Sequence, residues 1–415
     1  MKLSAIHPLA APLPGVFSGP VDHTDKSRRS MSAPPGVPSA PSRSAAPPIT
    51  PRSSGGVTPT RTPPPSDDRF VGWDAGPDPT TAICEYDVEG DWELRRDIAE
   101  FSIGGSSKCT ISIPGRGLSA RHCLLERRAR KLRLHDLDSS YGTFVRARKL
   151  EGSADLNPGD TFTARPMTFV CLNDEMRQHR PTLFEVVGPG AARSPDWVMV
   201  QAATGSGPLL FTGEAGCDLV RLARAVHAMS LRRSRPPIEV ATVAQERAAH
   251  VALVRRASRT SLILPLGDEK TPLDPHFASM LFDASMGVRL LVVASSLGVA
   301  RSALSDARVE LMQHVPVRPL AYRSAEIEKL FDRWFGERAF PLRFADLTPA
   351  NQDALRTYHW PDNFDELRAV ADALMAHVTR GGLRSAARSL GISHTMLQRR
   401  FGRVGLKLPF FCRDA

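Results

Sequence analysis

The sequence lacks several features that would place a protein in a narrow class. Its six cysteines are scattered without a C-x-x-C pair, so neither a zinc site nor a disulfide framework is indicated. No stretch approaches the roughly 18 consecutive apolar residues of a membrane helix. Pro8, Pro12 and Pro14 interrupt the apolar residues near the N-terminus, so a signal peptide is not expected either. We expect a soluble cytoplasmic protein with reduced cysteines, without a metal site and without a membrane partner.

The length and the charge of the chain indicate several domains and an anionic partner. A chain of 415 residues has room for about two to four domains. The formal net charge is +10 and the isoelectric point is about 9.7. A basic balance of this size favours binding to polyanions, although it says nothing about the fold.

The first segment, residues 1–66, is rich in proline, serine, alanine and arginine and has very few large apolar residues. Such a segment cannot bury enough surface to offset the entropy cost of ordering it, so we expect it to be disordered. Three threonines in it precede a proline, and they are either phosphorylation sites or ordinary parts of a solvated tail. They are Thr50, Thr58 and Thr62.

Residues 67–176 show short alternating apolar runs with closely spaced turn signals, which predict an all-β sandwich. Segment 101–113 reads F-S-I-G-G-S-S-K-C-T-I-S-I, segment 118–122 reads L-S-A-R-H, and segment 134–145 reads L-H-D-L-D-S-S-Y-G-T-F-V. In this order and spacing they resemble the three signature stretches of forkhead-associated (FHA) domains. The resemblance implies a sandwich whose loops bind phosphothreonine peptides at one end.

Carried onto this sequence, the resemblance implies that Ser119 donates its hydroxyl to the phosphate and that Ser140 donates a second hydrogen bond. Bonds of this kind to a charged group are roughly twice as strong as neutral ones. His122 takes a structural position of the family and should hydrogen-bond within the loop scaffold.

Two departures from the family weaken the phosphopeptide interpretation. Gly105 stands where the family has a loop arginine, and Tyr141 stands where it has an asparagine. Lys108 and Arg121 are close enough in sequence to supply the missing charge, or they are ordinary surface residues. The region therefore predicts either a phosphopeptide-binding domain or a degenerate sandwich used for protein contacts.

The segment 209–227 has the outline of a phosphate-binding loop between a buried strand and a helix, but its lysine is missing. A working loop reads G-x-x-x-x-G-K-[ST]. Here Gly213 opens the loop and Gly216 follows, whereas Asp218 replaces the motif's second glycine and Leu219 replaces its lysine. A carboxylate repels polyphosphate, and leucine adds no charge to compensate. The sequence therefore predicts a nucleotide-binding type of fold that has lost its chemistry.

Four collinear motifs extend over about 160 residues. They are G-E-A-G and A-R-A-V-H within 213–227, the strand 288–295, V-P-V-R at 315–318 and W-P-D-N-F-D-E-L-R at 360–368. In this order they resemble the AAA+ domain of bacterial enhancer-binding, sigma-54-dependent transcription activators. The resemblance implies an α/β domain at 180–345 followed by a helical lid at 346–379.

The same resemblance indicates that the catalytic groups are gone. Pro265 and Leu266 follow the strand that should end in the metal-binding Asp-Glu pair, and two arginine positions of the family hold Leu311 and Asp365. The G-A-F-T-G-A loop that contacts the sigma factor is also missing. Because phosphoryl transfer depends on positioned charge, we expect no enzyme activity and no cofactor. We interpret the domain as an inactive assembly scaffold.

The C-terminal segment 380–415 has the pattern of two short helices joined by a turn. Ala386 and Ala387 lie on one helical face, Gly391 makes the turn, and Ser393 caps the next helix. The segment resembles the Fis-type helix-turn-helix that ends these activators. Residues 376–415 carry eight lysines and arginines against one acid, which is the charge excess that a DNA reader needs.

The second helix of this pair would present a polar face to the major groove of double-stranded DNA. Met396, Leu397 and Phe401 are expected to face inward. The expected DNA-binding residues are Ser393, His394, Thr395, Gln398 and Arg399, with Arg400 and Arg403 at phosphates. The alternative is an amphipathic helical hairpin that closes the lid, with its arginines merely solvated.

The predicted architecture is multidomain: a disordered tail, an all-β FHA sandwich, an α/β P-loop-like domain with a helical lid, and an all-α helix-turn-helix. The first functional hypothesis is a DNA-binding transcriptional regulator that acts as a homodimer. The second is a phosphothreonine-dependent adaptor that does not bind DNA. In either case the phosphothreonine would belong to another protein or to the chain's own N-terminal tail.

Overall fold

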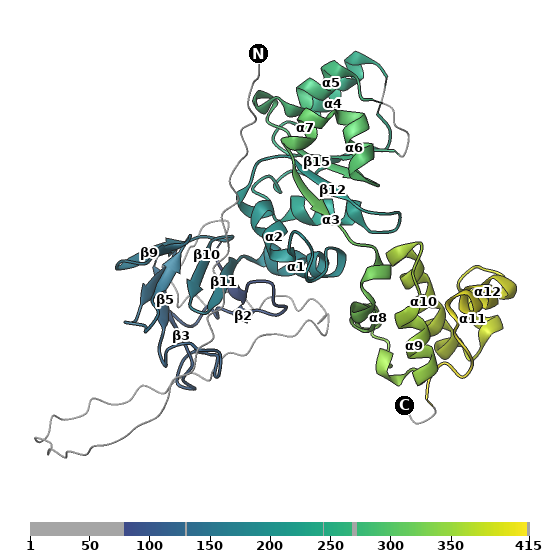
Figure 1. The fold of residues 1–415 in the computed structure, drawn as a ribbon, viewed down its shortest axis with the longest axis horizontal. Coiled ribbons are helices and arrows are strands. Elements are labelled where there is room, and N and C mark those ends of the chain that lie inside the picture. The colour runs from purple at the N-terminus through teal and green to yellow at the C-terminus, as the bar shows by residue number, and fades with distance from the viewer. Residues whose placement is uncertain (1–78, 129–130, 244, 268–271, 413–415) are drawn as a thin grey trace, which may run out of the picture. The chain divides into compact units, whose positions relative to one another are not determined.

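The computed structural model describes residues 79–128, 131–243, 245–267 and 272–412. The segment 1–66, with its three Thr-Pro pairs, therefore lies outside the described residues. In the part that is described, a β-sandwich, an α/β region and a helical region follow one another along the chain (Figure 1). No helix of the described ranges is long and apolar enough to cross a bilayer.

The first region consists of two sheets packed face to face, which confirms the predicted all-β sandwich. One sheet has the strand order β2-β1-β11-β10-β7-β8 and the other β4-β3-β5-β6-β9. Buried and accessible residues alternate along the strands, as in β6, where the buried Leu132 and Leu134 flank Arg133. Each sheet therefore turns one face to a shared core.

The strands of the sandwich are short. They are β1 (Ala82–Glu85), β2 (Trp92–Glu93), β3 (Glu100–Gly104), β4 (Ile111–Ser112), β5 (Cys123–Arg128), β6 (Lys131–Asp136), β7 (Thr143–Val145), β8 (Arg148–Lys149), β9 (Ser153–Leu156), β10 (Thr161–Ala164) and β11 (Met167–Leu172).

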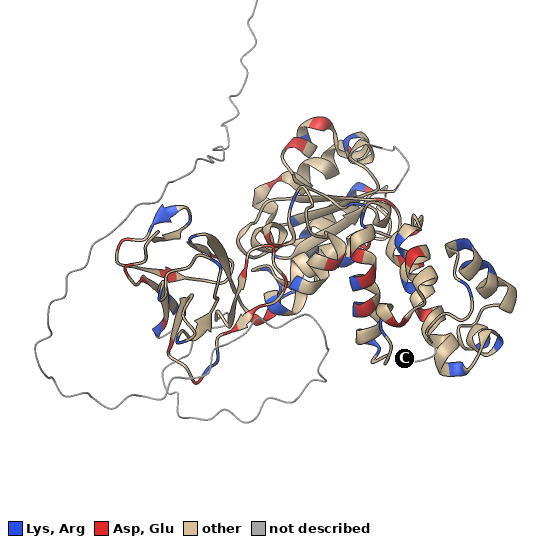
Figure 2. Ribbon diagram, turned by 60° about the horizontal axis from the view of Figure 1, so that its bottom comes forward, with Lys and Arg blue, Asp and Glu red and all other residues tan. Residues whose placement is uncertain are grey.

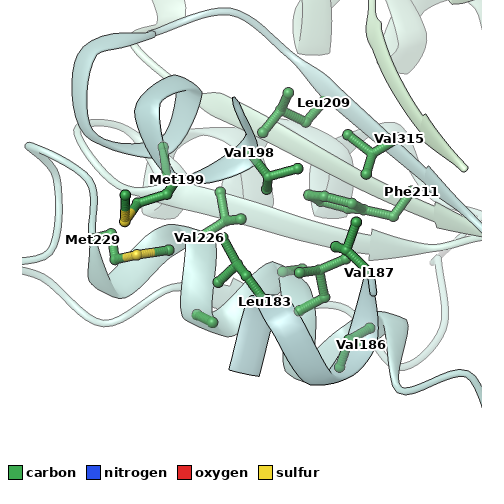
Figure 3. Packing of buried hydrophobic residues seen from close by; sticks show 14 of the residues in the cluster. Leu183, Val186, Val187, Val198, Met199, Leu209, Phe211, Val226, Met229 and Val315 are labelled. Atoms are coloured by element: carbon green, nitrogen blue, oxygen red, sulfur yellow. The ribbon is translucent and has the colours of Figure 1, made fainter. Parts of the chain in front are cut away.

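The second region is built on a parallel sheet with the order β13-β14-β15-β12-β16. Its central strands are buried almost throughout, as expected for a parallel sheet covered on both faces. Figure 3 shows the packing of one face, where Leu183 of α1, Val187 directly after α1 and Val226 of α3 lie near Phe211 and Val315 of the sheet.

Helices and strands alternate along this region. They are α1 (Asp174–Val186), α2 (Pro195–Thr204), β12 (Leu209–Thr212), α3 (Leu219–Ala228), β13 (Ile238–Glu239), α4 (Arg247–Ala257), β14 (Ser261–Pro265), α5 (Pro275–Phe282), η2 (Ala284–Met286), β15 (Arg289–Ala294), α6 (Leu297–Leu304), α7 (Asp306–Glu310) and β16 (Gln313–Pro316).

The third region is helical and has a single core. One cluster of buried apolar residues extends from Leu320 to Phe410, so the segments expected as lid and as DNA reader pack together. Phe331 of α8 lies against Trp360, with ring centroids 6.0 Å apart, although the predicted boundary at residue 345 assigns this helix to the α/β domain. The helices are η3 (Leu320–Tyr322), η4 (Ser324–Glu326), α8 (Ile327–Glu337), η5 (Phe344–Asp346), α9 (Pro349–Thr357), α10 (Asn363–Arg380), α11 (Leu383–Ser389) and α12 (His394–Val404).

Candidate functional site

Two loops of the sandwich meet at one end because glycine lets their backbones approach. The N–H of Gly105 donates to the carbonyl of Ser119 at 2.9 Å, and the N–H of Ser106 donates to that of Ala120 at 3.1 Å. A Cβ atom on Gly104 would lie only 2.4 Å from the Ala120 oxygen, so this position requires glycine. The loop after β3 is therefore fixed against the loop that carries Ser119.

Ser119 and Ser140, the two residues expected to bind phosphate, lie side by side at this end. The backbone N–H of Ser140 donates to Ser119 Oγ at 3.0 Å, and Ser119 Oγ donates to Ser140 Oγ at 3.4 Å. Ser140 is exposed and Ser119 is half-buried. The fold thus brings together two hydroxyls that are 21 residues apart in the chain and leaves them accessible.

His122 is buried and hydrogen-bonds within the loop scaffold, as the sequence predicts. The N–H of Ser119 donates to its Nδ1 at 3.3 Å, and its Nε2 lies 3.4 Å from the carbonyl oxygen of Gly142. Nδ1 is therefore the unprotonated nitrogen, and Nε2 carries the hydrogen. Burial lowers the pKa of His122 and so favours this neutral ring. The imidazole links the two loops that carry the serines.

Asp136, at the end of β6, anchors the loop that carries Ser140. Its carboxylate accepts hydrogen bonds from the backbone and the hydroxyl of Ser139, at 3.1 and 2.7 Å, and from the hydroxyl of Thr143. Burial alone would raise the pKa of Asp136, but the bonds from Thr143 and Ser139 outweigh it and hold the pKa below its usual range. Asp136 therefore holds the loop that carries Ser140.

Three basic residues belong to the loops and strands around this end. Lys108 and Arg121 are exposed, which fits both predicted roles, supply of the missing family arginine's charge and an ordinary surface position. Lys149 was not identified from the sequence. Its Cε lies 3.1 Å from the place that a Cβ on Gly142 would take. The short hairpin that pairs β7 with β8 brings Lys149 close to Gly142. The basic R-A-R-K sequence of residues 146–149 is the feature of the sequence that could have indicated Lys149 as a site residue.

The second candidate site is the loop between β12 and α3, at the C-terminal edge of the parallel sheet. Leu219, at the position of the motif's lysine, is 6% exposed and packs in the core with α1 and α2. Asp218 has a left-handed backbone with φ of 57° and precedes α3 without capping it. Gly213 opens the loop directly after β12. The residue that should reach a phosphate is instead buried among apolar side chains.

Residues 360–364 of the helical region cover this loop. The N–H of Phe364 donates to the carbonyl of Gly216 at 3.0 Å, and Asn363 Nδ2 donates to the carbonyl of Ala215 at 2.9 Å. A Cβ atom on Gly216 would lie 2.0 Å from the carbonyl oxygen of Asp362. In this structure Gly216 admits the backbone of the helical region, which is a different use of glycine from admitting a phosphate.

Four charged side chains beside the loop, Glu185, Asp218, Arg221 and Arg368, form what we call the loop cluster. Arg221 donates to both oxygens of Glu185 at 2.8 and 2.9 Å. Arg368 donates to Asp218 at 3.0 Å, makes a second, shorter bond to it, and reaches Glu185 at 3.3 Å. Burial alone would lower the pKa of both arginines, but the neighbouring carboxylates outweigh burial, so the pKa of each arginine is raised. The two guanidinium groups are thus neutralised within the protein.

Both positions that lack the arginines of the resembled family are exposed, although Asp365 Oδ1 still lies 3.9 Å from Arg368 Nη1 of the loop cluster. Leu311 is 67% exposed, and Asp365 is exposed at the first turn of α10. In the described ranges no group of three or more histidine, cysteine or acidic residues could hold a metal ion.

The third candidate site is the helix pair at the C-terminus. Ser393 caps α12, since its Oγ accepts the N–H of Met396 at 3.1 Å, and Gly391 in the turn has a φ of 67°. Leu397 and Phe401 are buried in the helical core. The prediction that Met396 faces inward is wrong, because its side chain is 54% exposed. The side of α12 that carries Leu397 and Phe401 is enough to cover the short α11, so Met396, beside that side, stays exposed to solvent.

The outer face of α12 is polar and largely free of internal contacts. Ser393, Thr395, Gln398 and Arg399 are exposed, and His394 is half-buried. Together α11 and α12 contain five arginines and no acidic residue, which the blue bands of Figure 2 display.

Two of these arginines also make contacts inside the protein. Arg400 Nη1 donates to the carbonyl of Ala369 at 3.3 Å. Arg403 Nη1 lies 3.6 Å from Glu366 Oε1, a nearly buried carboxylate that also accepts a bond from the Tyr358 hydroxyl at 2.9 Å. Both arginines therefore have a structural role beside the phosphate contacts that the sequence suggests.

Comparison with known proteins gives several likenesses to solved structures. NtrX from Brucella abortus in complex with ATP is 18% identical, with a TM-score of 0.35, over 56% of this chain and 68% of that chain. The FHA domain of CT664 protein from Chlamydia trachomatis is 16% identical, with a TM-score of 0.21, over 22% of this chain and 94% of that one.

EmbR from Mycobacterium tuberculosis, in complex with a low affinity phosphopeptide, is 20% identical with a TM-score of 0.21, and this chain spans 24% of its length. TM-scores of this size support no argument about function. No curated protein matches the chain. Residues 101–164, however, match the FHA domain family. This part of the sandwich is therefore an FHA domain.

Proposed function

We propose that the FHA domain binds phosphothreonine peptides at the end where Ser119 and Ser140 meet. The observation that carries this proposal is the pair of accessible hydroxyls, held in place by the neutral His122 and the ionised Asp136. Hydroxyl donors suit a phosphate because charge-assisted bonds are the strong ones. Lys108, Arg121 and Lys149 would supply the cationic part of the site.

A matched pair of peptides tests this proposal. A phosphothreonine peptide should bind, and its unphosphorylated twin should not. Ser119→Ala should weaken binding by about 1.5–3 kcal/mol, the range for a hydrogen bond to a charged group. Ser153→Ala, at an exposed position of β9, is the control and should bind as the wild type does. Equal titration curves for the two peptides would favour a degenerate sandwich used for other protein contacts.

The phosphothreonine belongs either to a partner protein or to the N-terminal tail of this chain. The Thr-Pro pairs at Thr58 and Thr62 precede the sandwich closely in sequence. Tethering would raise their effective concentration to roughly millimolar. If the tail occupies the site, the full chain phosphorylated at these threonines should bind added peptide more weakly than the unphosphorylated chain does.

We further propose that the α/β region is an AAA+-like domain that does not hydrolyse ATP and serves as a scaffold. Three observations support this proposal: Leu219 is buried, Gly216 is covered by the helical region, and Asp218 is paired with Arg368. Each group that should meet a phosphate already has a partner within the protein.

For the C-terminal helices we propose DNA binding, which makes the protein a DNA-binding transcriptional regulator. The exposed face of α12 would lie in the major groove, with Gln398 at adenine and Arg399 at guanine, each contact discriminating by about 1–3 kcal/mol. One helix pair buries little surface. We therefore propose a homodimer on an inverted repeat with half-sites about 34–36 Å apart, or a multiple of that spacing.

Titration against a selected operator and a scrambled duplex at two salt concentrations tests DNA binding. Arg399→Ala should abolish the preference between the duplexes. Arg388→Gln, an exposed arginine on α11, should lower the salt slope by roughly 0.9 without changing the preferred site. Arg388 is a better probe of phosphate contact than Arg403, because removing Arg403 would also leave the buried Glu366 carboxylate without this ion-pair partner.

The alternative function is a phosphothreonine-dependent adaptor that does not bind DNA. The shared core of lid and helix pair favours this alternative, because it gives α12 a packing role of its own. Wild-type protein that binds both duplexes equally, with no change on Arg399→Ala, would establish the adaptor as the better description.

A further inference from the structure

A basic hollow lies at the N-terminal edge of the parallel sheet, where α3 has ended and β14 and β15 begin. Its volume is about 480 Å³. The lining residues are Leu231, Arg232, Ser234, Arg235, Arg259 and Gly287. The nucleotide-type loop follows β12 at the C-terminal edge of the same sheet, so the hollow is a separate site.

Neutral hydrogen bonds fix the walls of this hollow. The N–H of Arg259 donates to the carbonyl of Gly287 at 2.9 Å, and Thr260 Oγ1 donates to the carbonyl of Pro236 at 2.9 Å. His227 lies between Ser261 Oγ and the carbonyl of Arg235, 2.9 Å from each. Burial lowers the pKa of His227 and keeps the ring neutral. The hollow is therefore formed before any ligand arrives.

The arginines of the hollow are bonded to carbonyl oxygens and not to carboxylates. Arg232 Nη1 donates to the carbonyls of Gly287 and Thr260, and Arg235 Nη1 reaches that of Ser258 at 3.5 Å. Among the described residues, no carboxylate forms an ion pair with Arg232, Arg235 or Arg259. By contrast, the exposed Arg224 of α3 is paired with Glu239. The positive charge at the hollow is thus left uncompensated.

A further buried arginine adds to the same positive potential. Arg289, at the start of β15, is 1% exposed, and its guanidinium donates to the carbonyls of Ala202 and Gln201 at 2.9 and 2.8 Å. Its Nε has no hydrogen-bond partner in the described part of the chain. Burial and the neighbouring Arg232 lower the pKa of Arg289 to about 10, so it remains charged at neutral pH.

Arg259 also sits in a backbone conformation that arginine rarely adopts, with a φ of 65°. Glycine or asparagine would fit this left-handed conformation with less strain. Strained residues cluster at sites where the side chain has a task. The left-handed turn at Arg259 places this residue in the lining of the hollow, two residues before β14 begins.

We propose that the hollow binds a phosphate-bearing anion of about nucleotide size. Guanidinium groups match phosphate oxygens in charge and in planar geometry. The hydroxyl of Ser234 adds a donor, and the side chain of Leu231, 77% exposed, offers an apolar surface to the rest of the ligand. The volume lies within the usual range of small-molecule sites. This site is independent of the proposed DNA and phosphothreonine binding.

The phosphate can come from a free nucleotide or from the backbone of a nucleic acid, and calorimetry on the full chain distinguishes the two. The probes are inorganic pyrophosphate, AMP, GMP and a short DNA duplex. The variants are Arg235→Gln and Arg259→Asn, since asparagine tolerates the left-handed backbone. Arg256→Gln, an exposed arginine of α4 outside the hollow, is the matched control.

If the ligand is a free anion, pyrophosphate or a mononucleotide binds saturably, each variant weakens it roughly tenfold, and the control does not. If the phosphate belongs to a nucleic acid, only the duplex binds, and Arg235→Gln weakens it roughly tenfold even in an Arg399→Ala background. The thermal midpoint of Arg259→Asn should not fall, because strain is relieved. The proposal is overturned if no probe binds, or if every probe binds both variants as it binds the wild type.

Discussion

The loop end of the FHA domain and the loop between β12 and α3 each depart from the motif that their sequence resembles, but what stands at the departing positions differs. At the FHA end, Gly105 and Tyr141 leave two serine hydroxyls accessible. At the second loop, Leu219 is buried and Asp218 is tied to Arg368. The first loss leaves an open site, whereas the second leaves a site that the protein closes with its own side chains.

The comparison shows that missing motif residues alone do not decide whether a site survives. The decisive question is whether neighbouring groups have taken the place of the ligand. In the loop cluster, Glu185 and Asp218 supply the negative charge and Arg221 and Arg368 the positive charge, so the electrostatics are complete without nucleotide. In the part of the chain that the structure describes, the Ser119 and Ser140 hydroxyls bond to each other and to a backbone N–H, and no carboxylate is hydrogen-bonded to them.

The largest effect that follows from this contrast is the loss of stability when the loop cluster is broken. Glu185→Gln removes a carboxylate that is 7% exposed and leaves Arg221 and Arg368 to share Asp218. Removing one partner of a buried ion pair leaves an uncompensated charge, so unfolding free energy should fall by about 3 kcal/mol. Urea denaturation monitored by circular dichroism measures the change.

Glu239→Gln is the matched control, because its pair with Arg224 is exposed on both sides (57% and 37%). A surface pair contributes less than about 1 kcal/mol. Equal losses for Glu185→Gln and Glu239→Gln would show that the loop cluster is as solvated as a surface pair and does not close the site.

The open FHA end should accept its missing arginine. A Cβ atom on Gly105 would lie 3.1 Å from the Leu118 carbonyl oxygen, a tight contact that a shift of a few tenths of an ångström relieves. Gly105→Arg should therefore tighten phosphopeptide binding about tenfold through one added charge-assisted bond. Fluorescence anisotropy with a labelled peptide measures this gain.

Ser107→Arg adds the same charge to the same loop at an exposed position and serves as the control. If both variants gain equally, the improvement is general electrostatic attraction and the position of Gly105 has no special relation to the phosphate.

The sequence predicts features set by local pattern better than features set by distant contacts. The sandwich and the FHA resemblance followed from segment order and alternation, and Ser119 and Ser140 followed from the resemblance. Glu185 and Lys149 were missed because each reaches its site through tertiary packing, across 36 residues to Arg221 in the case of Glu185. Met396 was placed wrongly because helical periodicity does not say how wide a face the partner helix covers.

A smaller effect should appear in the acid stability of the FHA domain. The folded pKa of Asp136 is lowered, so its contribution is present above the ordinary value of 3.8 and is lost as pH falls through the folded pKa. Asp136→Asn should cost about 1 kcal/mol at neutral pH, on the scale of a hydrogen bond, and the difference from wild type should shrink in strong acid. Thermal unfolding at pH 7, 4 and 2.5 measures both. A difference that does not change with pH would mean that the carboxylate charge is not what anchors Ser139.

The smallest expected effect is that of introducing the motif's lysine into the loop between β12 and α3. Leu219→Lys should produce no magnesium-dependent ATP hydrolysis and no ATP binding, since Asp218 and Arg368 still fill the site and Gly216 is still covered by Asp362. Because Leu219 is buried, the variant's folding is verified by circular dichroism before a phosphate-release assay and a fluorescent-nucleotide titration. The wild type should be equally inactive. Hydrolysis on the ~1 s⁻¹ scale of slower phosphoryl-transfer enzymes by either protein would show that the helical region opens and that the two loops differ less than their contacts indicate.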